Sequence, residues 1–367
     1  MQPQFAQHPF TKHRAVCCRR VADAVSLALL LWVLLLVGIP ARAQANSQWD
    51  NRFGPPPAGL GANGLVYALL THPDGSIYAA GQFTQVGSVA ANNIARWDPA
   101  TGTWSALGSG LTIAAGTGTP EVVAMDVDAA GKIYVAGRFD EAGGNFVRNV
   151  AMWDPATQQW SSLGTGDGVG VNTNVQGLAV GGNGFVYIGA STALNEAGGV
   201  TVRQTAQWDP STQTWSPVGT VGTGGSGVVR RIIADKNSRR VYYVGSFTNF
   251  PGSSQSVSVG SVGLAVWNAD TSAWSALGQG VVREGESSSS VGNIYAGRVD
   301  ADGNFYLGGA FTHAIQPNGT KIAANRIAKW NPSTQQWSAI GGGIAPNGTT
   351  STVPRAFLFE GNNLIVA

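Results

Sequence analysis

The sequence predicts an all-β fold made of one repeated unit, and three observations support this prediction. Five pairs of tryptophans stand seven positions apart, and successive pairs are separated by 56, 55, 59 and 63 residues. An apolar run containing tyrosine and glycine precedes each pair, and no stretch of the unit has a convincing helical period. Constant spacing within a unit and variable spacing between units indicate one supersecondary element that is copied along the chain. The paired tryptophans are Trp97, Trp104, Trp153, Trp160, Trp208, Trp215, Trp267, Trp274, Trp330 and Trp337.

The first half of each unit is predicted to be a β-hairpin. Its second strand is an apolar run such as residues 133–137, and a turn such as Asp74-Gly75 comes before it. Two β-rich runs joined by Asp-Gly or Asn-Gly are typical of a hairpin. A glycine ends the second strand, where we expect neighbouring backbone to approach closely. The third copy has Ala190 at this position, and the other copies have Gly81, Gly137, Gly245 and Gly309.

The tryptophan pair marks a second hairpin. Asp-Pro or Asn-Pro follows the first tryptophan in four copies, and the fourth copy has Asn268-Ala269 instead. The Asp or Asn side chain is expected to accept a hydrogen bond from backbone two residues on, and proline presets the turn. Each unit therefore contains about four short strands.

Stacking of such units predicts a β-propeller. A single four-stranded meander leaves both faces uncovered, and radial stacking covers them with neighbouring sheets. We expect the tryptophans to fill the space between sheets. The propeller should occupy residues 46–367, with about five full four-stranded blades plus a partial sixth. Residues 364–367 match the second strand of a sixth unit, so the chain is expected to be incomplete at its C-terminus, and residues 47–54 are expected to complete the last blade.

The repeat resembles a known family. Its sequence pattern is Gly-x-Phe followed by Asn-Ile-Ala-Arg-Trp-Asp-Pro and later Trp-Ser-x-Leu-Gly. This pattern is similar to kelch-type repeats over roughly residues 49–367. The likeness is to those of secreted bacterial kelch-like proteins and fungal cortical-marker ectodomains, and it implies a kelch-like β-propeller. Tryptophan in place of tyrosine and a longer period are departures from that pattern. The Trp-Asp pairs also suggest WD40 repeats, but those have a Gly-His element and a period of about 40–45 residues.

Residues 1–45 are predicted to be a targeting segment. Basic residues, including Lys12 and Arg14, precede an apolar stretch at residues 25–39, and small residues follow it. This order is typical of a secretory signal peptide. The alternative is an uncleaved signal anchor, although the stretch is slightly shorter than the ~20 residues of a membrane span. We therefore expect a secreted, extracellular or cell-surface protein, with a membrane contact only through such an anchor or a C-terminal tail beyond residue 367.

The charge of the chain argues against nucleic acid as a partner. Residues 1–43 contain five Lys or Arg and one acid, so the rest of the chain has 17 basic and 19 acidic residues. No basic face for nucleic acid is expected. Both cysteines also lie in the targeting segment, so the stability of the domain should come from packing instead of disulfides.

The remaining residues predict no cofactor and no metal. Galactose oxidase, an enzyme on a kelch-type propeller, needs a cysteine cross-linked to a tyrosine, and no cysteine follows Cys18. The domain has two histidines, His72 and His313, which cannot supply a three-histidine zinc site. We expect both to be exposed. The segment Asp300–Gly303 begins like a calcium loop but lacks the downstream acidic ligands.

Variation in loop length on one face indicates either a partner-binding face or loops that merely tolerate drift. The second and fourth connections of each unit vary in length and should lie on the same face, whereas the first and third are short. Variable loops on a rigid scaffold often bind partners. We therefore expect a non-catalytic module for a protein or glycan; the alternatives are a carbohydrate-active enzyme and a structural spacer of a longer surface protein. The candidate ligand-face residues are Arg138, Asp140, Glu141, Arg283, Glu284, Glu286 and His313.

Overall fold

A computed structural model of the chain divides it into two units, Met1–Gly54 and Pro55–Ala367, and all described residues belong to the second. The predicted signal peptide and the predicted closing strand at residues 47–54 lie outside the described residues. The described residues are 61–114, 118–191, 193–219, 226–249, 263–284, 294–344, 353–361 and 363–367.

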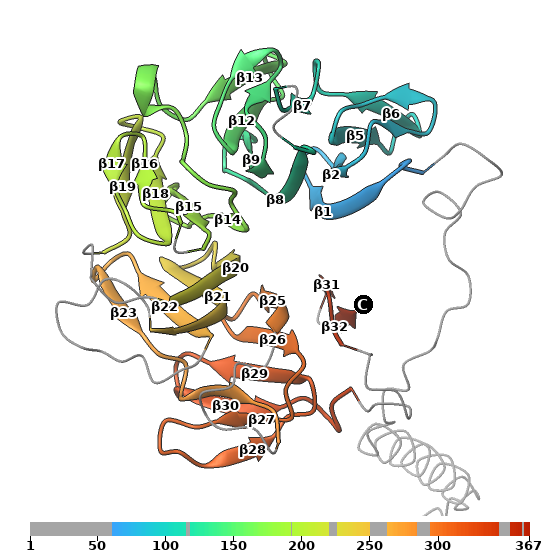
Figure 1. The fold of residues 1–367 in the computed structure, drawn as a ribbon. Helices are drawn as coiled ribbons and strands as arrows, with labels where there is room; N and C mark the ends of the chain where they lie inside the picture. The colour runs from blue at the N-terminus through green and yellow to red at the C-terminus, as the bar shows by residue number, and fades with distance from the viewer. Residues whose placement is uncertain are drawn as a thin grey trace, which may run out of the picture. The chain divides into compact units, whose positions relative to one another are not determined.

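The described residues form consecutive antiparallel sheets, which confirms the all-β prediction (Figure 1). Each of the first three sheets is a four-stranded meander in chain order, interrupted by small strands outside the sheet. The first sheet has β1 (Leu65–Thr71), β2 (Ile77–Gln82), β5 (Ile94–Asp98) and β6 (Thr103–Ala106). The second has β8 (Glu121–Val127), β9 (Ile133–Arg138), β12 (Val150–Asp154) and β13 (Gln159–Ser162). The third has β14 (Gly177–Val180), β15 (Val186–Gly189), β18 (Thr205–Asp209) and β19 (Thr214–Pro217).

Two more four-stranded sheets and a two-stranded sheet follow. The fourth sheet has β20 (Ser226–Ala234), β21 (Arg240–Asn249), β22 (Leu264–Asn268) and β23 (Ala273–Ser275). The fifth has β25 (Ile294–Val299), β26 (Phe305–Gly309), β29 (Ile327–Asn331) and β30 (Gln336–Ala339). The two-stranded sheet has β31 (Phe357–Glu360) and β32 (Asn363–Val366). Within the described part of the chain, the one helical turn is a 3-10 turn at Gly166–Gly168, and no helix is long and apolar enough to cross a membrane.

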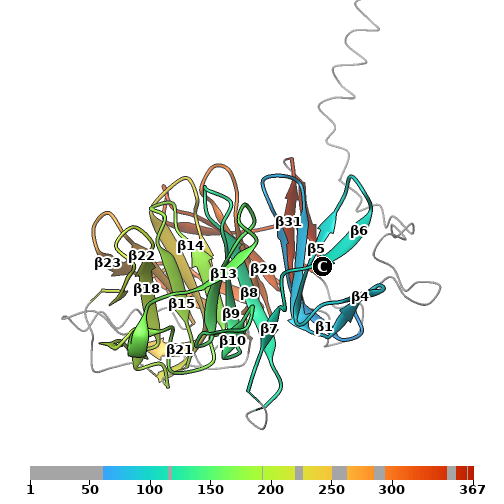
Figure 2. The same cartoon turned by 90° about the horizontal axis from the view of Figure 1, so that it is seen from above.

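Small strands outside these sheets form hairpins in the second connections. They are β3 (Gln85–Val86) with β4 (Val89–Ala90), β10 (Glu141–Ala142) with β11 (Asn145–Phe146), β16 (Glu196–Ala197) with β17 (Val200–Thr201), and β27 (His313–Ile315) with β28 (Lys321–Ala323). Two short strands of the fourth connections, β7 (Leu111–Thr112) and β24 (Gly280–Val282), pair with β10 and β27 of the following sheet. Figure 2 shows β4, β7 and β10 toward the same end of the sheets.

The repeated glycine lies opposite a β-bulge in the first strand of its own sheet. The register shifts after Val66, Val122, Val229 and Ile294, which face Gly81, Gly137, Gly245 and Gly309. A Cβ on Gly137 would overlap the carbonyl oxygen of Glu121, so only glycine fits there. In the third sheet, which has Ala190 at this place, the paired residues end at Gly177 and Gly189, and the backbone N–H of Gln176 also donates to the carbonyl of Gly189. The backbone that a Cβ would meet belongs to the same sheet, and the carbonyl of Gly137 also accepts a hydrogen bond from the backbone N–H of Val175 in the next sheet, at 3.0 Å.

The Asx turns join the third and fourth strands of all five sheets. The side-chain oxygen of each Asp or Asn accepts a hydrogen bond from the backbone N–H two residues on, at 2.8–2.9 Å. The tryptophans on either side of the turn are direct cross-strand partners, and their ring centroids are 5.2–5.4 Å apart. Eight of the ten are buried, and Trp104 and Trp274 are half-buried.

The second tryptophan of three pairs joins neighbouring sheets. The indole N–H of Trp160 donates to the carbonyl of Leu107 in the preceding unit, at 2.8 Å. Trp215 donates to Leu163 in the same way, at 3.0 Å. The first strands of consecutive sheets also contact each other, from β1 and β8 through to β25 and β31 (Figure 1). This row of first strands and the indole contacts hold the sheets face to face.

Candidate functional site

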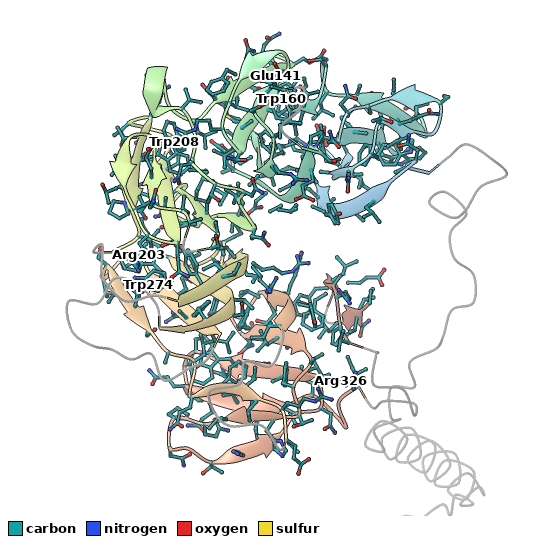
Figure 3. The ribbon with its side chains drawn as sticks, viewed as in Figure 1. Glu141, Trp160, Arg203, Trp208, Trp274 and Arg326 are labelled. Carbon is teal, nitrogen blue, oxygen red and sulfur yellow. The ribbon has the colours of Figure 1, made fainter. Side chains whose placement is uncertain are left out.

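Among the described residues, the second connections and the fourth connections that pair with them form a structured surface, which we call the hairpin face. It comprises the four small hairpins together with the fourth connections that pair with them. The opposite end, which we call the turn end, carries the short first and third connections. Each hairpin packs over its own sheet: a Cβ on Gly143, in the turn of β10–β11, would come within 2.7 Å of the Trp160 ring. Figure 3 shows Glu141, from the β10–β11 hairpin, beside Trp160 of the second sheet. The tryptophan pairs thus support this face as well as the core.

Three candidate residues lie together where the second sheet's hairpin meets the preceding connection. Asp140 accepts a hydrogen bond from the backbone N–H of Ala114, at 2.8 Å. Glu141 accepts one from the hydroxyl of Thr112, at 2.7 Å, and Arg138 donates through Nε to the carbonyl of Thr119, at 2.8 Å. All three side chains therefore anchor the connection from the first sheet, so these polar groups have a structural role.

The candidates of the fifth sheet occupy equivalent places. The Thr312 N–H donates to the Val282 carbonyl, and the Thr312 hydroxyl accepts from the backbone N–H of Glu284, at 2.7 Å. Thr312 thus repeats the part that Asp140 plays in the second sheet. His313 is half-buried in β27, and its Nδ1 lies 2.9 Å from that hydroxyl, whereas Arg283 is exposed. The prediction that His313 is exposed is therefore only partly right. Glu286 lies outside the described residues.

His72 is not the exposed turn residue that we expected. Its side chain is 9% exposed, its Nε2 donates to the carbonyl of Gly131 at 2.9 Å, and its Nδ1 lies 2.8 Å from Asp74 Oδ1. Gly131 belongs to the first turn of the second sheet, so His72 joins two neighbouring turns. Asp74 is partly buried, which raises its pKa, but hydrogen bonds from Ser76 and His72 outweigh this effect and lower the pKa of Asp74 to about 2.

Ion pairing also connects the hairpins. Arg148, which follows the second sheet's hairpin, donates to Glu196 of the third sheet's hairpin at 3.1 Å. Glu196 is the counterpart of Glu141 in the next unit. In contrast, Phe146 at the end of β11 is 62% exposed and Val200 in β17 is 37% exposed. The hairpin face therefore combines a fixed framework with exposed apolar side chains.

A second set of residues, which we call the inner rung, was not predicted. The β-bulges in the first strands leave one extra residue in each, namely Tyr67, Val123, Arg230 and Tyr295. Arg355 has the same geometry before β31, because its N–H and that of Ala356 both donate to the carbonyl of Ala367. These bulges come just after the fourth connections, so the inner rung lies near the hairpin face. The sequence feature that could have indicated this set is the Arg230-Arg231 pair within an apolar run. The bulge determines which way these two side chains point, and it is not visible in the sequence.

A cavity of about 240 Å³ lies between the fourth and fifth sheets, at the turn end. Arg240, Tyr242, Asn268 and Trp330 contribute to its lining. The Tyr242 hydroxyl is buried and makes no hydrogen bond with another described residue, and burial raises its pKa. Its ring stacks on Phe305, with centroids 4.4 Å apart. Across the described part of the chain, no group of three or more His, Cys, Asp or Glu side chains could hold a metal ion.

Comparison with known proteins supports the fold. The profile of a domain of unknown function (DUF5122), described as a β-propeller, matches residues 72–103, which run from the first turn of the first sheet to the start of β6. No curated protein matches the sequence. The repeated four-stranded meanders together with this match indicate a β-propeller.

Three solved structures are similar to the chain at low sequence identity. The extracellular domain of BT4673 from B. thetaiotaomicron is 12% identical, with a TM-score of 0.46 over 87% of this chain and 38% of that one. A structural genomics protein of unknown function from Bacteroides thetaiotaomicron VPI-5482 is 13% identical, with a TM-score of 0.48 over 88% and 70%. YCF48 bound to D1 peptide is 12% identical, with a TM-score of 0.43 over 76% and 68%. This chain thus spans well under half the length of the first of these structures.

Proposed function

We propose that this chain is an exported, non-catalytic, kelch-type propeller that binds a protein or glycan through its hairpin face. In this proposal the five four-stranded sheets are complete blades and β31–β32 belong to a sixth. The kelch assignment is supported by the repeated glycine, the tryptophan pair and the Asx turn, each of which occupies the same structural place in successive sheets. Export is supported by the sequence of residues 1–45.

The observation that carries the binding role is the contrast between the two ends of the sheets. The turn end repeats nearly identical Asx turns in all five sheets. The hairpin face repeats one backbone framework and fills equivalent positions with Gln85, Glu141, Glu196 and His313. A constant scaffold with varied side chains suits recognition of a partner. A catalytic role has less support, because the Asp140 and Glu141 carboxylates are engaged in anchoring the 112–114 segment.

The test is a binding screen on the chain, with a matched pair of surface variants. The full chain would be presented to glycan and protein arrays, and hits would be measured again with Phe146→Ser and with Gln336→Ser, an exposed residue near the turn end. We expect Phe146→Ser to weaken the hits severalfold and Gln336→Ser to leave them unchanged. Equal effects of the two variants, or no hit on either array, would overturn the proposal. Separate fractionation of the host cell would check export by detecting a shortened chain outside the cytoplasm.

A further inference from the structure

Arginine and tyrosine occupy the same bulge position on three consecutive sheets. Arg230 stands there in the fourth sheet, Tyr295 in the fifth, and Arg355 beside the two-stranded sheet. Because the position is structurally equivalent, these side chains extend from the first strand of each sheet at the same distance from the hairpin face. The first strands of these sheets contact each other in order, β20 with β25 and β25 with β31.

Two interactions link Arg355 to the neighbouring sheets, one with Tyr295 and one with Arg231. The Arg355 guanidinium lies over the Tyr295 ring, 4.7 Å from its centroid. Surrounding protein atoms and the like charge of Arg355 lower the pKa of Arg231, the residue next to Arg230. Arg230, Arg231 and Arg355 remain exposed to solvent, as does Arg298 farther along β25. Solvent therefore reaches the arginines, although many protein atoms surround Arg231.

No ion pair among the described residues neutralises the positive charge of this cluster of arginines, although β31 ends in the acid Glu360. Neither β20 nor β25 contains an acid, and none of the four arginines forms an ion pair with another residue that the structure describes. Asp126 on the first strand of the second sheet is already paired with Lys236, at 2.7 Å. Four like charges on one wall repel each other, so an anionic ligand would relieve this repulsion.

Packing fixes the position of Arg355 relative to the fifth sheet. A Cβ on Gly308 would come within 2.5 Å of the Phe357 ring and 2.9 Å of Pro354, so the two-stranded sheet lies directly on β26. Tyr306 and Phe359 also meet edge to face, with centroids 5.1 Å apart. The cluster is therefore built on packed strands instead of long loops.

We propose that the inner rung of Arg230, Tyr295 and Arg355, together with Arg231, binds the carboxylates of an acidic polysaccharide that carries a uronic acid on successive residues. This inference rests on the proposed binding function and names its partner class. All the cations are arginines, whose planar fork matches a carboxylate in two parallel hydrogen bonds, whereas lysine offers a point charge. The equivalent positions hold an arginine on the fourth sheet, the Tyr295 ring on the fifth and an arginine beside the two-stranded sheet. Two carboxylates joined by sugar rings match this order of charge, ring and charge better than an irregular acidic peptide does.

The experiment measures binding of oligogalacturonate to the full chain by calorimetry at two salt concentrations. The methyl-esterified oligomer has the same sugar backbone without the charge, and poly-glutamate supplies carboxylates on a peptide. We expect the free acid to bind, its affinity to fall with salt, and the ester to bind at least tenfold more weakly. Arg230→Gln and Arg355→Gln should each weaken binding about ten- to a hundredfold.

Arg239→Gln is the matched control, because Arg239 pairs with Asp270 at the turn end and loses the same charge on substitution. Arg355→Lys should bind more tightly than Arg355→Gln but more weakly than the wild type, because lysine keeps the charge and lacks the planar guanidinium that makes two parallel hydrogen bonds. Equal binding of acid and ester, no binding of the acid, an equal effect of Arg239→Gln, or tighter binding of poly-glutamate would each overturn the inference. If the arrays reveal a partner that depends on Phe146 while oligogalacturonate does not bind, this inference fails and the proposed function stands. No partner in either experiment would remove both.

Discussion

The indole N–H is the residue-scale feature that converts a repeated sequence into a stack of sheets. Trp160 buries its ring against Trp153, supports the hairpin turn at Gly143, and donates to Leu107 of the preceding unit. The indole N–H groups of Trp215 and Trp337 donate in the same way to the carbonyls of Leu163 and Leu277. Both leucines belong to the repeated Trp-Ser-x-Leu-Gly motif. One side chain thus takes part in the core, in the link between sheets and in the support of the hairpin face.

Replacing Trp160 should separate these roles. Trp160→Ala should lower the free energy of unfolding by about 3–5 kcal/mol, because it leaves a cavity between two sheets. Trp160→Phe retains a ring and loses the donor to the Leu107 carbonyl, which should cost less, about 1–3 kcal/mol. Denaturant unfolding of both variants and the wild type would measure the differences. An unchanged midpoint for Trp160→Ala would contradict the role of the ring as core.

The glycine opposite the bulge gives a second residue-scale prediction. Gly137→Ala should destabilise the chain by about 1–3 kcal/mol, because the added Cβ overlaps the Glu121 carbonyl and the strands must shift. Ala190→Gly is the reciprocal control in the third sheet, which has alanine at this place, and it should cost no more than about 1 kcal/mol. Thermal unfolding would compare them. A larger loss for Ala190→Gly than for Gly137→Ala would show that the bulge does not impose the glycine.

Asp74 predicts a pH-dependent contribution to stability. Its pKa is about 2 in the folded chain against an ordinary 3.8, so the carboxylate stabilises the fold above about pH 4 and the contribution is lost as the pH falls toward 2. Asp74→Asn removes this titration. The difference in melting temperature between the wild type and Asp74→Asn should therefore be largest near neutral pH and shrink below pH 4. A difference that stays constant between pH 6 and pH 2 would contradict the prediction.

At the scale of elements, local patterns in the sequence were enough to predict the four-stranded units. Asx turns, Asp-Gly turns and cross-strand tryptophans depend on residues within about ten positions, so their chemistry is visible in the sequence. The small hairpins could not be predicted in the same way. Each depends on pairing between a second connection and the fourth connection of the preceding sheet, as between Glu141 and Thr112, and such pairing is set by how two sheets meet. Residues predicted as free ligand-face groups were therefore found holding these connections.

The anchoring of the 112–114 segment is an element-scale prediction. Asp140→Ala removes the acceptor for the Ala114 N–H and should cost about 1–2 kcal/mol locally. Amide hydrogen exchange should show faster exchange in residues 111–114 and 141–146, while β8 and β9 retain their protection. Asp140→Asn, which keeps an acceptor oxygen, should behave nearly as the wild type. Uniformly faster exchange throughout the second sheet would mean that the connection is not a separate unit.

At the scale of the molecule, contacts run mainly between neighbouring sheets. The first strands meet in sequence from β1 to β31, and backbone N–H groups of Val175 and Val229 donate to Gly137 and Ala190 in the preceding sheets. The same organisation explains why the inner rung escaped prediction. Arg230, Tyr295 and Arg355 are far apart in the sequence and follow no fixed spacing, and only the bulges and the order of the sheets bring them to one level.

Nearest-neighbour packing predicts how a defect should spread. Stability in stacked repeats is approximately a sum of unit and interface terms, so a change at one interface should weaken the adjoining sheets most. Phe357 packs on Gly308, and it lies in a cluster with Ala296 and Ile327 of the fifth sheet. Phe357→Ala should therefore accelerate amide exchange in β25 and β26 first, and the effect should decline through the fourth sheet and vanish at β8 and β9. Phe247→Ala, within the core around the fourth sheet, should instead affect β20 and β21 most. Equal acceleration in all five sheets by Phe357→Ala would show that the stack unfolds as a single cooperative unit, and the nearest-neighbour account would then be wrong.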